Sequence, residues 1–352
     1  MTDTGKRALI TGVAGQDGGH LAKLLHEKGY KVYGILRGQM EASHPRYQQV
    51  REQMSYVNII MADLLDLSAL TRALQEIQPD EVYNLAAISH VGYSFRNPTL
   101  TADVTGKGVL HVLEAIRLAG LEKKTRFYQA STSEMFGGLA YNRPETGYTE
   151  DAIFHPRSPY GVAKLYGHWI TKNYRESYGM FASSGILFNH EGERRGPEFV
   201  TRKISKAVAR ISLGQQEYIE LGNLDAKRDW GYAGDYVEGM WRILQQDKPG
   251  DYVLATGEAH SIREFCEIAF REIGIALKWQ GSGVDEVGLD AATNKELVKI
   301  NPEYFRPSEV DFLLGDPAKA ETELGWKRKV DFPGLVKLMV EYDLGYEANR
   351  RQ

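Results

Sequence analysis

Short apolar runs alternate with longer amphipathic runs through the first half of the chain, and this alternation constrains the fold more than any other feature. The apolar runs predict strands at Arg7–Thr11, Lys31–Leu36, Val57–Met61, Glu81–Leu85, Arg126–Ser131 and Phe181–Leu187. Helical spacing predicts helices at His20–Lys28, Ser68–Ile77, Ala102–Ala119 and Pro159–Tyr178. Strands that alternate with helices join through right-handed crossovers. We therefore expect an α/β fold built on a doubly wound parallel sheet.

The alternation breaks down after about Leu187. Shorter, polar stretches follow, with glycine- and proline-marked loops around Gly192–Pro197, Gly222–Lys227 and Gly281–Asn294. These features predict a second, smaller lobe. No repeat or low-complexity linker separates the two parts, so we expect them to share one interface with a cleft.

Composition excludes several classes of protein. The 352 residues include 43 basic and 47 acidic residues spread along the chain, which argues against nucleic acid or anionic lipid as a partner. The first ten residues lack a secretory signal pattern, and no apolar run approaches membrane-spanning length. The single cysteine, Cys266, falls among apolar residues at helical spacing and is expected to be a buried core thiol, and the nine histidines show no metal-binding spacing. We expect a cytoplasmic, metal-free protein without a membrane partner.

A glycine-rich turn follows the first predicted strand. Gly12, Gly15 and Gly18 have the spacing GxxGxxG, which differs from the standard GxGxxG. Glycines here permit a tight turn and close approach of the backbone to a pyrophosphate, and the following helix N-terminus favours negative charge. Three glycines alone can also make a plain turn. The strand–turn–helix context favours a dinucleotide site.

Two charged residues follow the next strands. Arg37 ends the second strand, where a carboxylate usually binds the ribose of NAD, so an arginine favours the 2′-phosphate of NADP. The alternative is a solvated arginine. Asp63, just past the third strand, is placed to contact the adenine, although an ordinary N-cap for the helix at Asp66–Ile77 competes with this interpretation.

The chemistry is indicated by four residues. Tyr160 and Lys164 lie on one helix face, where the ammonium is expected to lower the phenol pKa so that Tyr160 can take a proton from an alcohol. A surface pair at this spacing is the ordinary alternative. Thr132, at the end of the fifth strand, can bond the reacting hydroxyl. Glu134 is not needed for hydride transfer, and a carboxylate here suggests a second proton abstraction followed by loss of a hydroxyl. The alternative is an exposed loop glutamate.

Six sequence runs together resemble one known family. They are Tyr128–Glu134, Tyr160–Tyr166, Gly185–Glu191, Phe199–Lys203, Arg228–Trp230 and Tyr304–Pro307. With the glycine turn, they resemble the extended short-chain dehydrogenase/reductase superfamily, and within it the GDP-mannose 4,6-dehydratases among the nucleotide-sugar 4,6-dehydratases. The resemblance implies a Rossmann-type sheet in an NADP-binding domain at 1–187, to which 229–258 returns. A smaller C-terminal α/β lobe at 188–228 and 259–352 would bind the nucleotide sugar.

The resemblance also implies roles for individual residues. Tyr160 would deprotonate the C4 hydroxyl, Lys164 would tune it and hold the nicotinamide ribose, Thr132 would hold O4, and Glu134 would remove the C5 proton and assist departure of the C6 hydroxyl. Cofactor contacts are implied for Gly12, Val13, Ala14, Gly15, Gln16, Asp17, Arg37, Asp63, Leu64, Leu85, Ala86, Ala87, Ser89, Tyr160, Lys164, His190 and Arg195. Contacts to the GDP-sugar are implied for Ser89, Asn189, Lys203, Arg228, Arg306 and Glu309. The enzyme would be a redox-neutral hydro-lyase that retains its NADP.

The sequence departs from the family pattern in three places. Gly38 stands where a second arginine is usual, Ile88 and Tyr93 replace a glutamine and a smaller residue near the sugar pocket, and Glu191–Arg195 replaces a Glu-Ser-Pro pattern. The last two changes leave open the same reaction on a GDP-manno-heptose. A 4-epimerase or 4-reductase would share Tyr160 and Lys164 without needing Glu134, and a non-catalytic dinucleotide sensor would need only the glycine turn. The family also implies a homotetramer in which Gly38–Ser55 reaches a neighbour's cofactor site.

Overall fold

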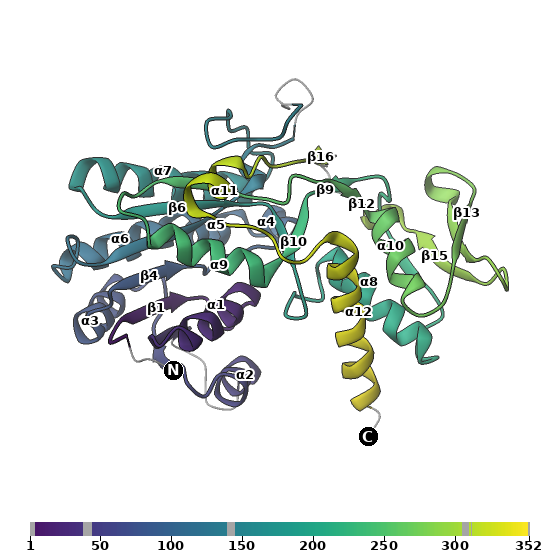
Figure 1. The fold of residues 1–352 in the computed structure, drawn as a ribbon, viewed down its shortest axis with the longest axis horizontal. Helices are drawn as coiled ribbons and strands as arrows, with labels where there is room; N and C mark the ends of the chain where they lie inside the picture. The colour runs from purple at the N-terminus through teal and green to yellow at the C-terminus, as the bar shows by residue number, and fades with distance from the viewer. Residues whose placement is uncertain (1–3, 38–43, 139–144, 305–309, 311, 351–352) are drawn as a thin grey trace.

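Seven parallel strands form the central sheet, in the order β11-β6-β5-β4-β1-β2-β3 (Figure 1). The computed structural model describes residues 4–37, 44–138, 145–304, 310 and 312–350. The strands are β1 (Arg7–Thr11), β2 (Lys31–Leu36), β3 (Asn58–Met61), β4 (Glu81–Asn84), β5 (Arg126–Thr132), β6 (Ala182–Leu187) and β11 (Asp251–Leu254). The six strands predicted from the sequence are confirmed to within one residue at each end. The doubly wound parallel sheet is confirmed as well.

Helices cover both faces of this sheet. On one face, α1 (Gln16–Glu27) and α9 (Ala233–Leu244) pack side by side over an apolar core that includes Leu21 and Met240. On the other face, α3 (Leu67–Ile77), α6 (Gly108–Leu118) and α7 (Pro159–Tyr178) enclose a second core. Burial of an apolar helix face against each side is what keeps a parallel sheet out of water.

The helix α7 begins and ends where the sequence predicts. The Ser158 hydroxyl accepts a hydrogen bond from the amide of Gly161, Pro159 occupies the first turn, and Gly179 ends the helix at φ 60°. These are the residue types that favour a helix start and a helix stop. The helix that carries Tyr160 and Lys164 therefore has both of its ends fixed by local sequence.

Two predicted helices start earlier than expected. The α1 helix begins at Gln16 rather than His20. The sequence prediction placed the start too late because Gly18 and Gly19 are weak helix formers. The segment predicted at Ala102–Ala119 is preceded by α5 (Pro98–Thr101), passes through a π-helical stretch, η1 (Ala102–Lys107), and continues as α6. Here Gly106 packs against α7, where a Cβ would lie 3.4 Å from the Ala163 carbonyl oxygen.

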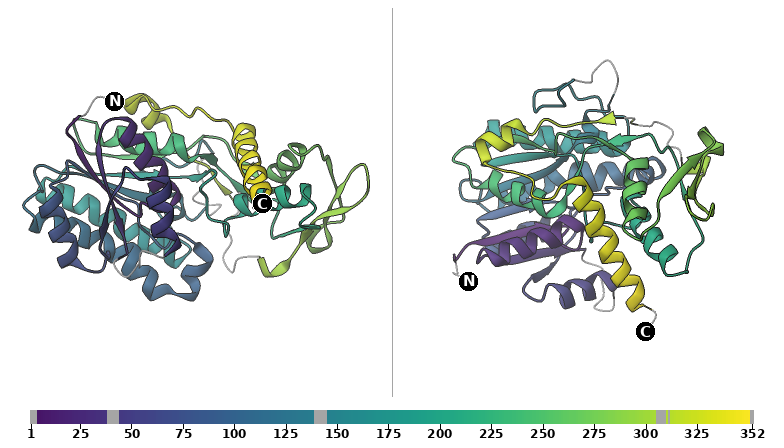
Figure 2. Two further views of the ribbon diagram at one scale, coloured as in Figure 1. Left: turned by 90° about the horizontal axis from the view of Figure 1, so that it is seen from below. Right: turned by 45° about the vertical axis from the view of Figure 1, so that its right-hand side comes forward.

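A smaller lobe lies beside the sheet (Figure 2). It contains α8 (Val200–Ser212), α10 (Ile262–Arg271), α12 (Phe332–Asn349) and a mixed sheet in the order β13 (Leu277–Gln280), β14 (Val287–Asp290), β15 (Glu296–Ile300) and β8 (Ile219–Leu221). Cys266 is fully buried in its core, so the prediction of a core thiol is confirmed. Shorter elements are α2 (Pro45–Gln53), α4 (Val91–Arg96), α11 (Ala318–Leu324), β7 (Asn189–Glu191), β9 (Lys227–Arg228), β10 (Trp230–Tyr232), β12 (His260–Ser261) and β16 (Phe312–Leu313).

After β6 the chain leaves the central sheet as β7, which pairs in parallel with β10. The chain then returns to the central sheet through α9 and β11, which pairs in parallel with β6. Among the described residues, no helix is both long and apolar enough to cross a membrane, and no cluster of histidine, cysteine and acidic side chains is suited to a metal ion.

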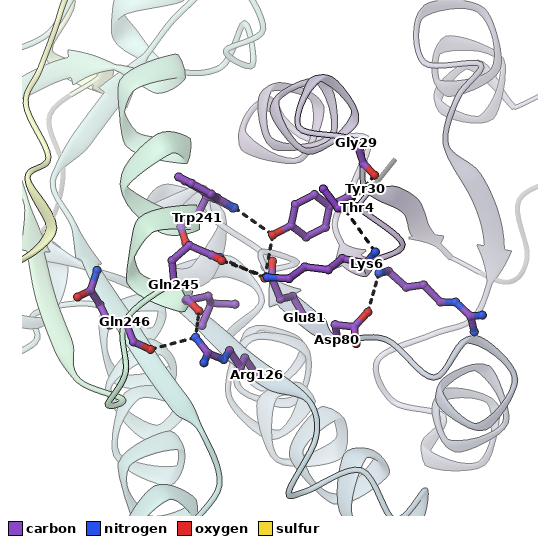
Figure 3. A network of polar contacts seen from close by, with 12 residues as sticks. Thr4, Lys6, Gly29, Tyr30, Asp80, Glu81, Arg126, Trp241, Gln245 and Gln246 are labelled. Carbon is purple, nitrogen blue, oxygen red and sulfur yellow. Dashed lines mark hydrogen bonds and ion pairs between the residues drawn. The ribbon is translucent and has the colours of Figure 1, made fainter. Parts of the chain in front are cut away.

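A buried carboxylate ties α9 to the opposite end of the central sheet from the cavity described below (Figure 3). Glu81, which begins β4, is 1% exposed and accepts hydrogen bonds from Tyr30 Oη at 3.0 Å and Gln245 Nε2 at 3.1 Å. Tyr83 Oη donates to its other oxygen at 2.8 Å, and Lys6 Nζ lies 3.4 Å away. Because each oxygen of this carboxylate has donors, its burial is compensated.

Candidate active site

A cavity of about 1670 Å³ opens along the carboxyl ends of the central strands and extends under the smaller lobe. Of the predicted site residues that the structure describes, all but Val13 line it. The Val13 side chain is fully buried and packs against Gly34, so the contact predicted for Val13 would have to come from its main chain. Arg306 and Glu309 lie outside the described residues.

The glycine turn has the close contacts that a dinucleotide site requires. Gly12 has φ +71°, and a Cβ there would lie 2.9 Å from the backbone of Ala86. A Cβ on Gly18 would lie 2.3 Å from the carbonyl oxygen of Gly12, so larger residues would break the packing of turn and helix. Gly15 caps α1 without a side-chain hydrogen bond, and the first residues of the helix line the cavity. These residues fit a pyrophosphate.

Arg37 and Asp63 lie beside each other at the ends of β2 and β3. The guanidinium Nε is 3.6 Å from a carboxylate oxygen of Asp63, and both side chains are substantially exposed at the cavity rim. The carboxylate of Asp66, not that of Asp63, caps α3 by accepting a hydrogen bond from the Ala69 amide at 2.9 Å. The N-cap interpretation of Asp63 is therefore wrong, because that position belongs to Asp66.

Thr132, Tyr160 and Lys164 meet where β5 ends and α7 begins. Each is at most 8% exposed, and the Thr132 and Tyr160 side chains are hydrogen-bonded to each other. Glu134 lies in a single 3₁₀ turn, η2 (Ser133–Met135), and is half-buried on the cavity wall. A Cβ on Gly161 would lie 3.0 Å from the Glu134 carbonyl oxygen, so the glycine after Tyr160 lets α7 approach this turn closely.

The expected effect of Lys164 on Tyr160 is wrong for this structure. Lys164 Nζ donates a hydrogen bond to the main-chain oxygen of Ala130 at 2.7 Å and lies 5.9 Å from the centroid of the Tyr160 ring. Burial raises the pKa of Tyr160, an effect that the hydrogen bond with Thr132 offsets only in part. Burial also lowers the pKa of Lys164 to about 8. The phenol is therefore neutral here, and the lysine is held on β5.

Two ion pairs in the cavity could not be foreseen in full from the sequence. His190 Nε2 lies 2.8 Å from Asp17 Oδ2, and Arg195 Nε lies 2.9 Å from Glu191 Oε2. Asp17 and His190 were predicted only as separate cofactor contacts. They are 173 positions apart in the chain, and no local pattern signals such a contact. The Glu191–Arg195 pair has i,i+4 spacing, which was the available signal.

Three substrate-side candidates line the cavity: Asn189 on β7, Lys203 on α8 and Arg228 on β9. Asn189 Oδ1 is buried without a hydrogen-bond partner among the described residues. This oxygen can therefore accept a hydrogen bond from a bound ligand. Lys203 Nζ lies 3.6 Å from the centroid of the Tyr304 ring, and burial lowers its pKa. Arg228 is 8% exposed and also lines the cavity.

The departures from the family pattern lie around this cavity in different ways. Ile88 lines it, whereas Tyr93 does not, although Gly92 and Phe95 on either side of Tyr93 do. Tyr93 is the third residue of α4, and its side chain is exposed. Glu193 lies 3.7 Å from His20 of α1, and Arg194 packs over Gly19. The inserted charges therefore contact the cofactor helix.

Comparisons with known proteins agree on one family. The family model described as GDP-mannose 4,6 dehydratase matches residues 9–339. A GDP-mannose 4,6-dehydratase of Sinorhizobium fredii is 52% identical over the full length of both chains, and GDP-mannose 4,6 dehydratase 2 of Caenorhabditis elegans is 52% identical over 96% of this chain and 89% of its own.

Solved structures share the fold. The UDP-glucose 4-epimerase of Thermus thermophilus, in complex with NAD, has a TM-score of 0.78 at 27% identity and covers 96% of this chain and 99% of its own. RMD from Pseudomonas aeruginosa, complexed with NADPH, has a TM-score of 0.75 at 22% identity, over 97% of this chain and 99% of its own. Both neighbours hold a nicotinamide dinucleotide.

Proposed function

The chain belongs to the GDP-mannose 4,6-dehydratase family, and from this premise we propose that it converts GDP-mannose into GDP-4-keto-6-deoxymannose with a nicotinamide cofactor. One observation carries the proposal beyond simple hydride transfer. Glu134 lines the cavity beside the hydrogen-bonded Thr132 and Tyr160. A 4-epimerase or a 4-reductase needs the last two residues but has no step that requires a carboxylate at this place.

The residues perform a sequence of proton transfers around O4, C5 and C6 of the sugar. Tyr160 first loses its own phenol proton to solvent, and Thr132 binds the C4 hydroxyl. The Tyr160 phenolate then takes the hydroxyl proton as C4 is oxidised to a ketone. An oxidised nicotinamide held by the glycine turn and Lys164 would supply the acceptor for the C4 hydride and the source of the hydride that C6 receives. The ketone acidifies the C5 proton, Glu134 removes it, and the same carboxylic acid protonates the departing C6 hydroxyl. As the hydride adds to C6, C5 takes a proton either from Tyr160 or from solvent, and in the second case Tyr160 gives its proton to solvent.

For the cofactor we propose NADP rather than NAD. Arg37 supports this choice, because its guanidinium stands at the end of β2, where the adenine ribose of a dinucleotide binds. Asp63 then serves to orient Arg37 and to face the adenine. Other predicted contacts, from the glycine turn and from Leu85 to Ser89, line the same cavity and support this proposal.

For the nucleotide we propose that Asn189, Lys203 and Arg228 face the GDP moiety. Lys203 and Arg228 suit a diphosphate, and their burial strengthens a charge-assisted hydrogen bond. Arg306 and Glu309 complete the proposed site from outside the described residues. We further propose that 1–187 with 229–258 is the cofactor domain, that 188–228 and 259–352 form the substrate lobe, and that four copies assemble. Light scattering after gel filtration tests the tetramer.

The reaction is tested by following an isotope. The enzyme is incubated with NADP and GDP-mannose that carries deuterium at C4, and the product is analysed by mass spectrometry and NMR. Deuterium at C6 of a keto-deoxy sugar is the expected result. A product without deuterium at C6 would rule out internal hydride return. GDP-manno-heptose, run in parallel, ranks the two substrates.

A further inference from the structure

His190 carries a positive charge that its hydrogen bonds specify. Its Nδ1 lies 2.7 Å from the carbonyl oxygen of Phe188, and its Nε2 lies 2.8 Å from a carboxylate oxygen of Asp17. A carbonyl oxygen and an ionised carboxylate can only accept, so both ring nitrogens donate. The ring is therefore an imidazolium, although it is only 8% exposed.

The surroundings of His190 sustain this charge. Burial alone would lower the pKa of His190, but the charge and the hydrogen bond of Asp17 outweigh it and raise the pKa above the usual value. Burial would likewise raise the pKa of Asp17, yet His190 and the side-chain amide of Gln16 hold it well below its ordinary range. The ring also stacks on Tyr236, with centroids 4.7 Å apart.

Other titratable groups face the pair from every neighbouring element. They are His20 on α1, Glu191 and Arg195 in and after β7, Tyr160 and Lys164 on α7, Tyr128 on β5 and Tyr236 on α9. Arg195 is already balanced by Glu191 at 2.9 Å. His190 is thus the cation in direct contact with Asp17.

The pair also joins two parts of the chain that hold different ligands. Gln16 Nε2 donates to the main-chain oxygen of His190 at 2.9 Å and to Asp17 Oδ1 at 3.1 Å. Two consecutive residues at the start of α1 thereby hold one residue of β7. The neighbour of His190 in that strand is Asn189, a proposed contact of the nucleotide sugar.

We propose that Asp17 and His190 form a charged latch that retains the cofactor, with His190 cancelling a carboxylate that would otherwise repel the pyrophosphate. This inference rests on the proposed function. The pyrophosphate binds at the amino end of α1, where Asp17 is the second helical residue. With a neutral His190, an unbalanced carboxylate remains beside an anionic ligand in a poorly solvated site, where repulsion is strong. Both members of the pair are positioning residues.

The test measures NADPH affinity on protein freed of cofactor, by fluorescence titration between about pH 6 and about pH 10. In the wild type, affinity is expected to fall above the His190 pKa by up to about tenfold per pH unit, the limit for one required proton. Asp17→Asn removes the part of this dependence that His190 causes, whereas His190→Gln binds weakly at every pH. The double variant D17N/H190Q regains affinity relative to H190Q, because it has no charge to balance. His26→Gln, on the same helix, behaves like the wild type.

Because Asp17 also raises the pKa of Lys164, the wild type and Asp17→Asn are compared a second time with Lys164→Arg in both, so that the charge at position 164 does not titrate. Parallel pH profiles of these two proteins, or a double variant no tighter than H190Q, would overturn the inference. If the wild type still transfers deuterium to C6 in that case, the proposed function stands. Failure of the wild type to bind NADPH at any pH would overturn both.

Discussion

Lys164 donates its hydrogen bond to the main-chain oxygen of Ala130 at 2.7 Å, so the ammonium is anchored to β5 and stands apart from the phenol of Tyr160. This contact orders the lysine before any ligand binds. A lysine fixed in this way would meet a bound ligand without the entropy cost of ordering a mobile side chain.

The charge of Lys164 should set an alkaline limit to activity. Its folded-state pKa of about 8 is lowered by burial, so the ammonium is present below that pH and is lost as the pH rises through it. We expect kcat/KM for the dehydration to fall above about pH 8. Lys164→Arg, measured over the same range, should be less active but should keep its activity to higher pH, because a guanidinium stays charged. An unchanged alkaline limb in this variant would assign the limit to another group.

Glu134→Gln should stop the reaction after the first oxidation. A carboxamide cannot remove the C5 proton, and loss of a positioned acid or base typically costs between about 10² and 10⁴ in rate. Stopped-flow absorbance should show reduced nicotinamide accumulating in a single turnover, with little keto-deoxy product. Glu176→Gln, at an exposed position on α7, is the matched control and should leave both readouts unchanged. Normal turnover by E134Q would remove Glu134 from the mechanism.

Arg37→Ala should change the choice of cofactor. The guanidinium at the rim of the cavity is the proposed partner of the 2′-phosphate, and a hydrogen bond to a charged group contributes about 1.5 to 3 kcal/mol. Titrations should show NADPH binding weakened by about tenfold or more, with NADH binding nearly unchanged. Arg72→Ala on α3 serves as the control for a general loss of positive charge. Equal weakening of both cofactors would argue against a 2′-phosphate contact.

Glu81→Ala should destabilise the molecule far from the cavity. The change leaves the buried hydroxyls of Tyr30 and Tyr83 without their acceptor, whereas Lys6 and Gln245 keep other partners (Figure 3). The expected cost is about 3 kcal/mol in the free energy of unfolding. Tyr30→Phe removes one donor and should cost about 1 kcal/mol. Urea unfolding followed by circular dichroism measures both, while NADPH affinity at low urea should stay near that of the wild type. Equal stability of E81A and the wild type would show that the network is dispensable.

Much of the fold could be predicted because its signals are local. Short apolar runs identified six strands. The ends of α7 were predicted correctly because Ser158, Pro159 and Gly179 are strong start and stop signals. The start of α1 was missed because Gly18 and Gly19 read as a loop. Their small size is needed for the close approach to Gly12 and to the side chain of Arg194, which is a tertiary requirement.

The members of the candidate site could be predicted better than their contacts. Carboxyl ends of parallel strands meet at one sheet edge, so residues that follow strands converge on the cavity. Helical periodicity placed Tyr160 and Lys164 on one face, but it could not show that Lys164 turns to Ala130. The contact between Asp17 and His190 also lay beyond reach, because it depends on how the strand after β6 leaves the sheet.

The pairing of β11 with β6 makes the sheet depend on a late part of the chain. All six residues of β6 are buried, and β11 covers what would otherwise be its open edge. A protein cut after Leu187 would present that edge as a template for intermolecular strand pairing. During synthesis, β11 cannot join the sheet until Leu254 has left the ribosome. By then, residues of the smaller lobe have already emerged. The two lobes are therefore expected to mature together, and a fragment containing only the first would aggregate.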